Sequence, residues 1–593
     1  MIPAIIVVLP LLLAAFLAIV LYKDPAPIKY IALAASLVSL AIAIYIFFFS
    51  LNTYQSFNWF NLSGYSFNLS TSTAPLQAML LLLVSIITPL IFLYSMGFME
   101  LPSEQSRFYS EMCIFAAAMM LFSISASFLT LIIAWELLGI TSYLLIGFFY
   151  KKDGPPTAAR KAITTIIIGD LAMLGAVVLI LNAYHSLEYS AILGAGASPS
   201  LTLAMALLLV AVLTKSAQFP FHEWLSDAME GPTPVSAFLH SSTMVKAGVF
   251  LVMTLLPLFQ LSGLLGVILV IGLVSAAIGA TNALTDRHIK KVLAYSTIED
   301  LGLMFVALGL GSLAAAAMLF VVQTFYKALL FMGAGAIMKA NDGREDLYSL
   351  YNSMSNKLIF IPIVVGVLSI AAFPPLGGFF GKAAVETSAL PDLPVYVILL
   401  AISLVTSTYA FRWLILSLRG DGVNRTKTEL VAYSGMPRSM TTAMVILAAL
   451  VVLSGAAYLS LPSYLSLPAS AIAISPQEAL IGFAVSVAGA ALAYYVYRLN
   501  KRAYLSSTHT ALYYLLHNSS MVNGAYGLAI SLFMAIAEAV ARFDYAFDKA
   551  TYQTADYFIM LGNVGKGVVN GQVNGYVLAF ALGIAVLVVV FLV

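Results

Sequence analysis

Long apolar runs alternate with short polar segments along almost the whole chain. Most runs are close to the roughly 20 residues that a helix needs to cross the hydrocarbon core of a bilayer. About 16 such runs can be distinguished by their hydrophobic pattern. They lie at residues 2–22, 30–49, 75–97, 109–125, 127–150, 162–184, 201–219, 232–256, 263–284, 292–309, 313–338, 358–389, 394–418, 441–460, 475–497 and 576–593. The pattern predicts an all-α polytopic membrane protein with about 16 transmembrane helices.

Composition excludes a large soluble catalytic domain. Hydrophobic residues make up 62% of the 593 positions and charged residues only 9%, whereas about 25% of the residues in a typical soluble domain are charged. Because the run at 2–22 has no basic flank before it, we expect a first transmembrane helix rather than a cleaved signal peptide. The net charge of +2 gives no indication of a nucleic-acid partner. Cys113 is the single cysteine, and an iron–sulfur cluster takes about four, so no such centre is expected in this chain.

The distribution of Lys and Arg predicts how the spans are oriented. The loops at 50–74, 185–200 and 461–474 contain neither residue, while the loops on the other side of the predicted bilayer are basic. Basic loops stay in the cytoplasm, so both termini are predicted to lie outside a cell or inner membrane. A few cations fall inside the predicted spans instead, namely Lys215, Lys246, Lys327, Lys382 and Arg412.

The segment 499–575 is predicted to lie along the cytoplasmic surface as an amphipathic helix. Polar residues from Glu538 to Asp556 recur at spacings of 4, 7, 4 and 3, and apolar residues from Ile536 to Phe547 at spacings of 4, 3 and 4. This is the pattern of a helix with one polar and one apolar face. Such a long rod indicates contact with neighbouring subunits and lipid. The alternative is an irregular segment, because its several glycines weaken a helix.

Two short segments with similar sequences indicate an internal repeat. Residues 213–220 and 367–374 each place Phe-Pro inside an apolar run. Proline breaks helices, and a broken helix in each half of the chain is typical of transporters with inverted repeats. The simpler alternative is a pair of ordinary proline kinks. The regions predicted on this basis are N-terminal helices at 1–108, a first half-channel repeat at 109–256, a second at 263–418, C-terminal helices at 419–498, the lateral segment at 499–575 and a final anchor at 576–593.

Charged side chains deep in the spans are the candidate functional residues. Burying a charge there costs at least roughly 2.5–3.5 kcal/mol, so such residues usually face the bundle interior or a water path. Lys215, Lys246 and Lys327 lie near the middle of their runs, and Glu136 and Asp170 are acidic residues deep enough to balance them. Arg412 lies seven residues before Arg419, close enough to the surface for a topological anchor.

A row of buried lysines with carboxylate partners is suited to proton transfer. Desolvation lowers the pKa of an amine and a nearby carboxylate raises it again, so moving the partner moves the proton. His240 adds a group that titrates near neutral pH, although a single hydrogen bond would satisfy it equally well. Structural pairing of each lysine is the alternative. The spacing of His222 indicates no metal site, and the chain contains no nucleotide-binding motif.

These residues sit in motifs that resemble a known family, the antiporter-like subunits of respiratory complex I and of Mrp antiporters. The longest motif runs from Lys215-Ser-Ala-Gln-Phe-Pro through His240 to Lys246-Ala-Gly. The others follow in the family's order: Trp135-Glu136-Leu-Leu-Gly139, Lys291-Val-Leu-Ala-Tyr-Ser-Thr297, Tyr326-Lys327-Ala-Leu-Leu-Phe331 and Phe373-Pro-Pro-Leu-Gly-Gly-Phe-Phe-Gly-Lys382. The lateral segment and final span are similar to those of the L subunit.

The resemblance implies a proton-translocating subunit without redox chemistry of its own. Quinone, flavin and iron–sulfur centres would belong to partner subunits of the membrane complex. Glu136 would pair with Lys215, Lys327 would be the central site and Lys382 would lie near the outward exit.

Several positions depart from the L-type pattern. Gln323 and Leu319 stand where histidines are typical, Lys246 is similar to the Mrp pattern, and Ala383 replaces a frequent acid. Glu299 and Asp300 are unexpectedly acidic for their motif. Two alternatives stay open: an Mrp-type or hydrogenase-associated cation/proton antiporter subunit, and a mainly structural clamp of the membrane arm.

Overall fold

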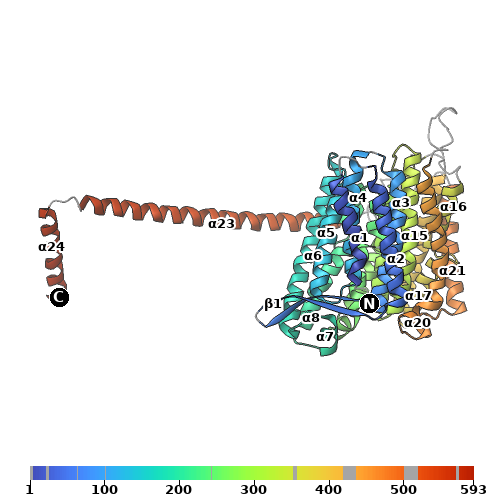
Figure 1. Ribbon diagram of the computed structural model, residues 1–593, viewed down its shortest axis with the longest axis horizontal. Coiled ribbons are helices and arrows are strands. Elements are labelled where there is room, and N and C mark those ends of the chain that lie inside the picture. The colour runs from blue at the N-terminus through green and yellow to red at the C-terminus, as the bar shows by residue number, and fades with distance from the viewer. Residues whose placement is uncertain are drawn as a thin grey trace. The chain divides into compact units, whose positions relative to one another are not determined.

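The structure is a computed structural model that describes residues 4–21, 26–62, 64–100, 102–241, 243–350, 357–418, 436–499, 519–568 and 573–592. The chain divides into two units, residues 1–518 and residues 519–593. The first unit is a bundle of helices that stand side by side, with one small β-hairpin at the end of the bundle where the N-terminus lies (Figure 1).

The prediction of an all-α polytopic membrane protein is confirmed. In the part of the chain that the structure describes, 11 helical stretches are long and apolar enough to cross a membrane, and four shorter apolar helices accompany them. The helices of the first unit are α1 (Leu9–Val20), α2 (Ile28–Phe49), α3 (Pro75–Phe98), α4 (Pro102–Ser123), α5 (Phe128–Ile146), α6 (Gly154–Tyr184), α7 (Tyr189–Ala195), α8 (Leu201–Lys215), α9 (Glu223–Asp227), α10 (Thr233–Ser241), α11 (Met244–Thr254), α12 (Leu256–Leu261), α13 (Leu265–Thr285), α14 (Ile289–Gly309), α15 (Leu313–Ala340), α16 (Lys357–Ile370), α17 (Gly377–Ser388), α18 (Leu393–Leu418), α19 (Arg438–Leu453), α20 (Ala457–Tyr464) and α21 (Pro476–Tyr494).

The β-hairpin was not predicted from the sequence. Strands β1 (Tyr54–Leu62) and β2 (Tyr65–Ser72) pair antiparallel and occupy the loop at 50–74 that contains no Lys or Arg. Aromatic residues, which favour strands, are frequent in this loop, and Gly64 turns the chain with a φ of +87°. The backbone of β2 also bonds to the end of α4, where the amide of Ser72 donates to the carbonyl of Ile124 at 2.8 Å. The hairpin is thereby tied to the bundle.

Two helices end where the sequence predicts broken helices. At the end of α8 the amide of Gln218 donates to the carbonyl of Leu213 at 2.9 Å, and at the end of α16 the amide of Phe373 donates to the carbonyl of Leu368 at 2.9 Å. Ala217 and Ala372 adopt φ values of +48° and +57° just before these amides, which is the left-handed conformation of a Schellman cap. Both interruptions are confirmed, while the inverted relation of the two halves stays a prediction.

Helix α14 lies at the centre of the bundle because small residues let α13 approach it closely. A Cβ atom added at Gly279 of α13 would come within 2.5 Å of the backbone nitrogen of Glu299, and one added at Gly302 of α14 within 2.7 Å of that of Ala276. Such contacts are closer than side chains allow. The close approach buries nearly all of α14, which carries two of the acidic residues discussed below.

The second unit contains the predicted amphipathic helix. Helix α23 extends over 50 residues, Ser519–Val568, and is followed by α24 (Val573–Leu592). Glu538 and Arg542 form the expected i,i+4 ion pair at 3.3 Å, and Val540, Phe543 and Phe547 lie exposed on the apolar face. Helical structure is confirmed over Ser519–Val568, whereas residues 500–518 and 569–572 of the predicted segment lie outside the described residues.

Candidate functional site

The first buried lysine lies at the C-terminal end of α8, where the helix breaks. The ammonium group of Lys215 is fully buried; it donates to the carbonyl of Trp135 at 2.9 Å and lies 3.9 Å from the carboxylate of Asp170. The Trp135 indole donates to the same carboxylate at 2.7 Å. Gly139, one turn after Trp135 on α5, leaves room for this ammonium, because a Cβ there would lie only 3.3 Å from it. Helices α5, α6 and α8 therefore bring together a lysine, an acid and an aromatic ring.

The structure differs from the expected pairing of Glu136 with Lys215. Among the described residues the ion pair of Lys215 is made by Asp170 on α6, while Glu136 on α5 is partly exposed and forms no ion pair. Adjacent residues of a helix point about 100° apart, so Trp135 faces the lysine and Glu136 is turned to the side. Glu136 nevertheless lies close enough to interact electrostatically with both groups.

Lys246 is buried without a carboxylate among its direct partners. From α11 its ammonium donates to the carbonyl of Phe320 at 2.7 Å and to the hydroxyl of Thr324 at 2.5 Å, both on α15. It also lies 4.4 Å from the centre of the Phe320 ring. On the other side α11 packs tightly against α8, because a Cβ at Gly248 would meet the hydroxyl of Ser216 at 2.2 Å. Lys246 thus extends from the helix beside Lys215 to the helix that carries Lys327.

Lys327 forms the most deeply buried ion pair of the described bundle. Its ammonium on α15 lies 2.8 Å from the carboxylate of Asp300 on α14 and donates to the hydroxyl of Ser296 at 2.7 Å. Both side chains of the pair are 0% exposed. A charge in such surroundings is tolerated only with a close partner, and Asp300 supplies it.

Lys382 on α17 is paired with the neighbouring acid of the same helix α14. Its ammonium lies 3.5 Å from the carboxylate of Glu299, and both groups are buried. The hydroxyl of Thr406 on α18 also donates to Glu299. Because Glu299 and Asp300 are consecutive, they point in different directions from α14, one toward α17 and the other toward α15. Helix α14 thereby links Lys327 and Lys382.

Sequence reasoning noted Glu299 and Asp300 as unusual but did not assign them to the site. The signal was present, since two adjacent acids in the middle of an apolar run are as costly to bury as the lysines. What the sequence could not supply was which helices α14 would contact. The structure therefore adds two acids to the predicted residues.

His240 and Arg412 have local structural partners. His240 on α10 is 1% exposed and its ring lies 5.7 Å from that of Phe331, without an ion pair among the described residues. The anchor interpretation required Arg412 to reach the surface, and the structure shows that it does not. It is 1% exposed and donates to the backbone carbonyls of Ala283 and Asp286 at 3.3 and 2.6 Å. The arginine thus caps the C-terminal end of α13, because those carbonyls have no partners within the helix.

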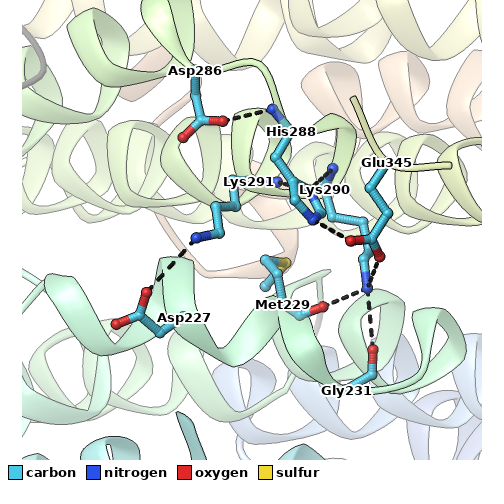
Figure 2. Close-up of polar contacts among 8 residues, drawn as sticks. All are labelled: Asp227, Met229, Gly231, Asp286, His288, Lys290, Lys291 and Glu345. Carbon is cyan, nitrogen blue, oxygen red and sulfur yellow. Dashed lines mark hydrogen bonds and ion pairs between the residues drawn. The ribbon is translucent and has the colours of Figure 1, made fainter. Parts of the chain in front are cut away.

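A polar network holds the N-terminal end of α14, which begins at Ile289 (Figure 2). The Nδ1 atom of His288 accepts from the amides of Lys290 and Lys291 at 3.2 and 3.4 Å, so the proton of the neutral ring is on Nε2, which donates to Glu345 at 2.7 Å. The Lys290 ammonium lies 3.6 Å from Glu345 and donates to the carbonyls of Met229 and Gly231. The network fixes α14 to the segment before α10.

Glu345 is the acid on which this network depends, and its titration predicts how stability varies with pH. Burial alone would raise the pKa of Glu345, but the hydrogen bond from His288 and the charge of Lys290 lower it from 4.5 to about 2. A depressed pKa stabilises the fold above the unfolded value of 4.5, and that contribution is lost as the pH falls toward 2. We expect Glu345→Gln to destabilise the solubilised protein at pH 7 by about 1 kcal/mol or less, because the side chain is 41% exposed.

Thermal unfolding of the wild type and the Glu345→Gln variant across this pH range tests the prediction. The difference between their melting temperatures should shrink as the pH falls from 4.5 to about 2. Glu538→Gln serves as the control, since that carboxylate is 71% exposed. A difference that is independent of pH would contradict the assignment.

The described residues offer no group of three or more His, Cys, Asp or Glu side chains that could hold a metal ion. Instead, buried polar atoms without a hydrogen-bond partner in the described structure accompany the lysines. They include Oε2 of Glu299, Oδ1 of Asp300, both amide atoms of Gln323 and Nδ1 of His240. Buried polar groups are normally satisfied by protein or water. These atoms are therefore suited to a hydrated path.

Comparison with known proteins supports the resemblance found in the sequence. The family described as "NADH:quinone oxidoreductase/Mrp antiporter, TM" matches residues 125–409, and that described as "NADH-Ubiquinone oxidoreductase (complex I), chain 5 N-terminus" matches residues 59–109. The chain is 32% identical over 449 residues to the chloroplastic NAD(P)H-quinone oxidoreductase subunit 5 of Mesostigma viride, an alignment that covers 70% of this chain and 68% of the relative.

A second relative agrees with this assignment, and two solved structures share the fold. Subunit 5 from the organellar chromatophore of Paulinella chromatophora is 34% identical over 62% of this chain, which spans 58% of that relative's length. The Mrp complex of Dietzia sp. DQ12-45-1b shares the fold, with a TM-score of 0.77 at 22% identity over 91% of this chain and 60% of that chain. An archaeal membrane-bound sulfane sulfur reductase gives 0.68 at 19% identity, over 81% of this chain and 99% of that chain. The chain belongs to the family of antiporter-like membrane subunits represented by subunit 5 of NAD(P)H-quinone oxidoreductases.

Proposed function

We propose that this protein is a proton-translocating subunit of a complex I-type quinone oxidoreductase. The observation that carries the proposal is the series of buried lysines on packed helices, in which Lys215, Lys327 and Lys382 each face a carboxylate. Electron transfer would take place in partner subunits that hold the quinone, flavin and iron–sulfur centres. This chain would contribute proton movement.

The chemistry of the pairs favours proton transfer over a purely structural role. Burying an ion pair is often no more stabilising than burying apolar side chains of the same volume, so three such pairs in one bundle are poorly explained by stability. When a carboxylate moves away from a buried ammonium, the lysine releases its proton more readily, and the groups titrate together. Redox events in a partner need only change the distance between Asp170 or Glu136 and Lys215 to start the transfer.

The helix contacts support one order of transfer. Lys246 on α11 lies between α8, which carries Lys215, and α15, which carries Lys327. Helix α14 then connects Lys327 through Asp300 and Glu299 to Lys382. We propose that protons pass along this series toward Lys382, starting from Lys215 or from Lys327. Gln323 and His240 would line the hydrated path.

The basic loops support the orientation. We propose that the loops rich in Lys and Arg face the cytoplasm, which places both termini and the β-hairpin outside. Helix α23 would lie along the cytoplasmic surface, where its exposed apolar face at Val540, Phe543 and Phe547 would contact lipid or neighbouring membrane subunits.

Proton uptake by membrane vesicles that contain the assembled complex tests the function. Electron donor and quinone are added, and pumping is followed with a pH-sensitive dye and an ionophore control. The proposal predicts proton movement that depends on quinone reduction and falls in a Lys382→Ala variant. Pumping at the wild-type rate in that variant would contradict it.

Lys246 favours a second candidate, a cation/proton antiporter subunit of the Mrp type. An antiporter would exchange Na⁺ for H⁺ across vesicles that carry an imposed pH gradient but receive no electron donor. The first proposal predicts no such exchange. Sodium-dependent proton release without an electron donor would support the second.

A further inference from the structure

Glu386 is a buried acid that the proposed series from Lys215 to Lys382 does not use. It lies on α17 four residues after Lys382, so the two side chains share one face of the helix. Only 7% of the residue is exposed, and its carboxyl group interacts electrostatically with Lys382. The residue that directly follows Lys382 is Ala383, which can carry no proton. Glu386 is thus the next titratable group along this face.

The two oxygens of Glu386 face two different helices. The hydroxyl of Ser403 on α18 donates to Oε1 at 2.6 Å. Toward Oε2 the neighbouring position is Gly482 on α21, where an added Cβ would lie 3.2 Å from the oxygen. One oxygen is therefore held in place by a hydroxyl, and the other faces a position without a side chain.

A second acid lies one helical turn from Gly482. Glu478 is four residues earlier on α21 and so occupies the same face of that helix. Its Oε2 accepts a hydrogen bond from the hydroxyl of Thr387 at 3.4 Å and another from the amide of Ser475 at 2.9 Å. Thr387 directly follows Glu386, so α17 carries the first acid and contacts the second.

Exposure increases along this set of residues. Lys382 and Glu386 are buried, whereas Thr387 and Glu478 are partly exposed and Leu390 is exposed. The C-terminal end of α17 lies at the same end of the bundle as the N-terminus and the β-hairpin (Figure 1). By the distribution of basic loops this is the outer side. The residues therefore lead from the last buried lysine to the outside.

We infer that Glu386 is the proton-carrying residue between Lys382 and the outer surface, with Glu478 as the next acceptor. The inference rests on the proposed function. In the first step an N–H bond of the Lys382 ammonium breaks and an O–H bond forms on the Glu386 carboxylate, which leaves a neutral amine and a neutral acid. In the second step Glu386 gives that proton to the Glu478 carboxylate or to outside water and becomes a carboxylate again. Charge is conserved in both steps.

Glu386→Gln and Glu386→Asp distinguish proton transfer from a structural role. Glutamine keeps the size and the acceptor for Ser403 but carries no exchangeable acid proton, while aspartate keeps the acid on a shorter chain. In vesicles with the assembled complex, Glu386→Gln should lower proton release at least about fivefold, because the path loses a group that accepts and donates a proton. Glu386→Asp should keep at least about half of the activity and shift its pH profile, and the melting temperature of Glu386→Gln should stay within about 2 °C of the wild type.

If the Glu386→Gln complex releases protons at the wild-type rate and with the wild-type pH profile, the inference is overturned. Lys327→Ala, measured in the same assay, separates the two proposals. If Lys327→Ala loses pumping and Glu386→Gln does not, only the role of Glu386 is wrong. If neither variant loses pumping, the proposed function itself fails. Should Glu386→Gln not assemble, Ser403→Ala is measured instead. Because that variant keeps the acid but loses its hydrogen-bond donor, slower release supports the inference and an unchanged rate overturns it.

Discussion

Replacement of Asp300 by asparagine is expected to abolish most proton translocation and to destabilise the protein strongly. The carboxylate lies 2.8 Å from the Lys327 ammonium, and both side chains are 0% exposed. Removing one partner of such a pair leaves an uncompensated charge, which typically costs about 3–5 kcal/mol. Release of the proton of Lys327 would offset only part of that cost, and a permanently neutral lysine would no longer alternate between its two states. The loss is measured as the melting temperature of the solubilised protein and as proton uptake by vesicles.

A double-mutant cycle separates the pair from its surroundings. Asp300→Asn combined with Lys327→Met removes both charges, so the double variant should be more stable than the sum of the two single changes predicts. Asp346→Asn is the matched surface control, because the side chains of its ion pair with Arg287 are 42% and 45% exposed and the pair should contribute at most about 1 kcal/mol. If Asp300→Asn and Asp346→Asn lower the stability of the protein equally, the structural account of the central pair is contradicted.

The second large effect is expected at Lys215. Lys215→Ala should reduce proton translocation at least about tenfold, since the series loses its first proton-carrying group. Assembly should be largely intact, because the Asp170 carboxylate that remains still accepts a hydrogen bond from Trp135 at 2.7 Å. Pumping by the complex and the amount of assembled complex are measured on the same membranes.

Replacement of the acidic residues near Lys215 tests which of them is its partner. Glu136→Ala is also expected to lower pumping sharply, by the resemblance, whereas the geometry makes Asp170 the direct partner. Asp170→Asn should therefore lower both pumping and stability, while Glu136→Ala, at a partly exposed position, should lower pumping with little change in stability. Loss of assembly in Glu136→Ala would contradict this division of roles.

Much of this architecture could be predicted from the order of apolar runs. The membrane helices follow directly from run length, and the two interruptions follow from the Phe-Pro positions, where α8 and α16 end. The amphipathic helix also follows from its periodicity over Ser519–Val568. These features depend on neighbours in the sequence, which is why a single sequence is sufficient to find them.

Features that depend on distant contacts were less accessible. The β-hairpin lies in a loop between membrane helices. Its strands are recognised only when they pair with each other and bond to the end of α4. Run length could not reveal that Lys215 faces Asp170 rather than Glu136, or that Arg412 turns inward to cap α13. The pairing of Lys327 and Lys382 with adjacent acids required knowing that α14 contacts both α15 and α17. Composition indicates that buried charges exist, and packing decides which of them meet.

The central claim is that the buried lysines carry protons, and the number of protons moved per electron tests it most directly. The measurement compares wild-type complex with complex that contains Lys327→Ala, in sealed vesicles with matched amounts of assembled protein. The account predicts fewer protons per electron in the variant. An unchanged ratio at an unchanged rate of quinone reduction would contradict it.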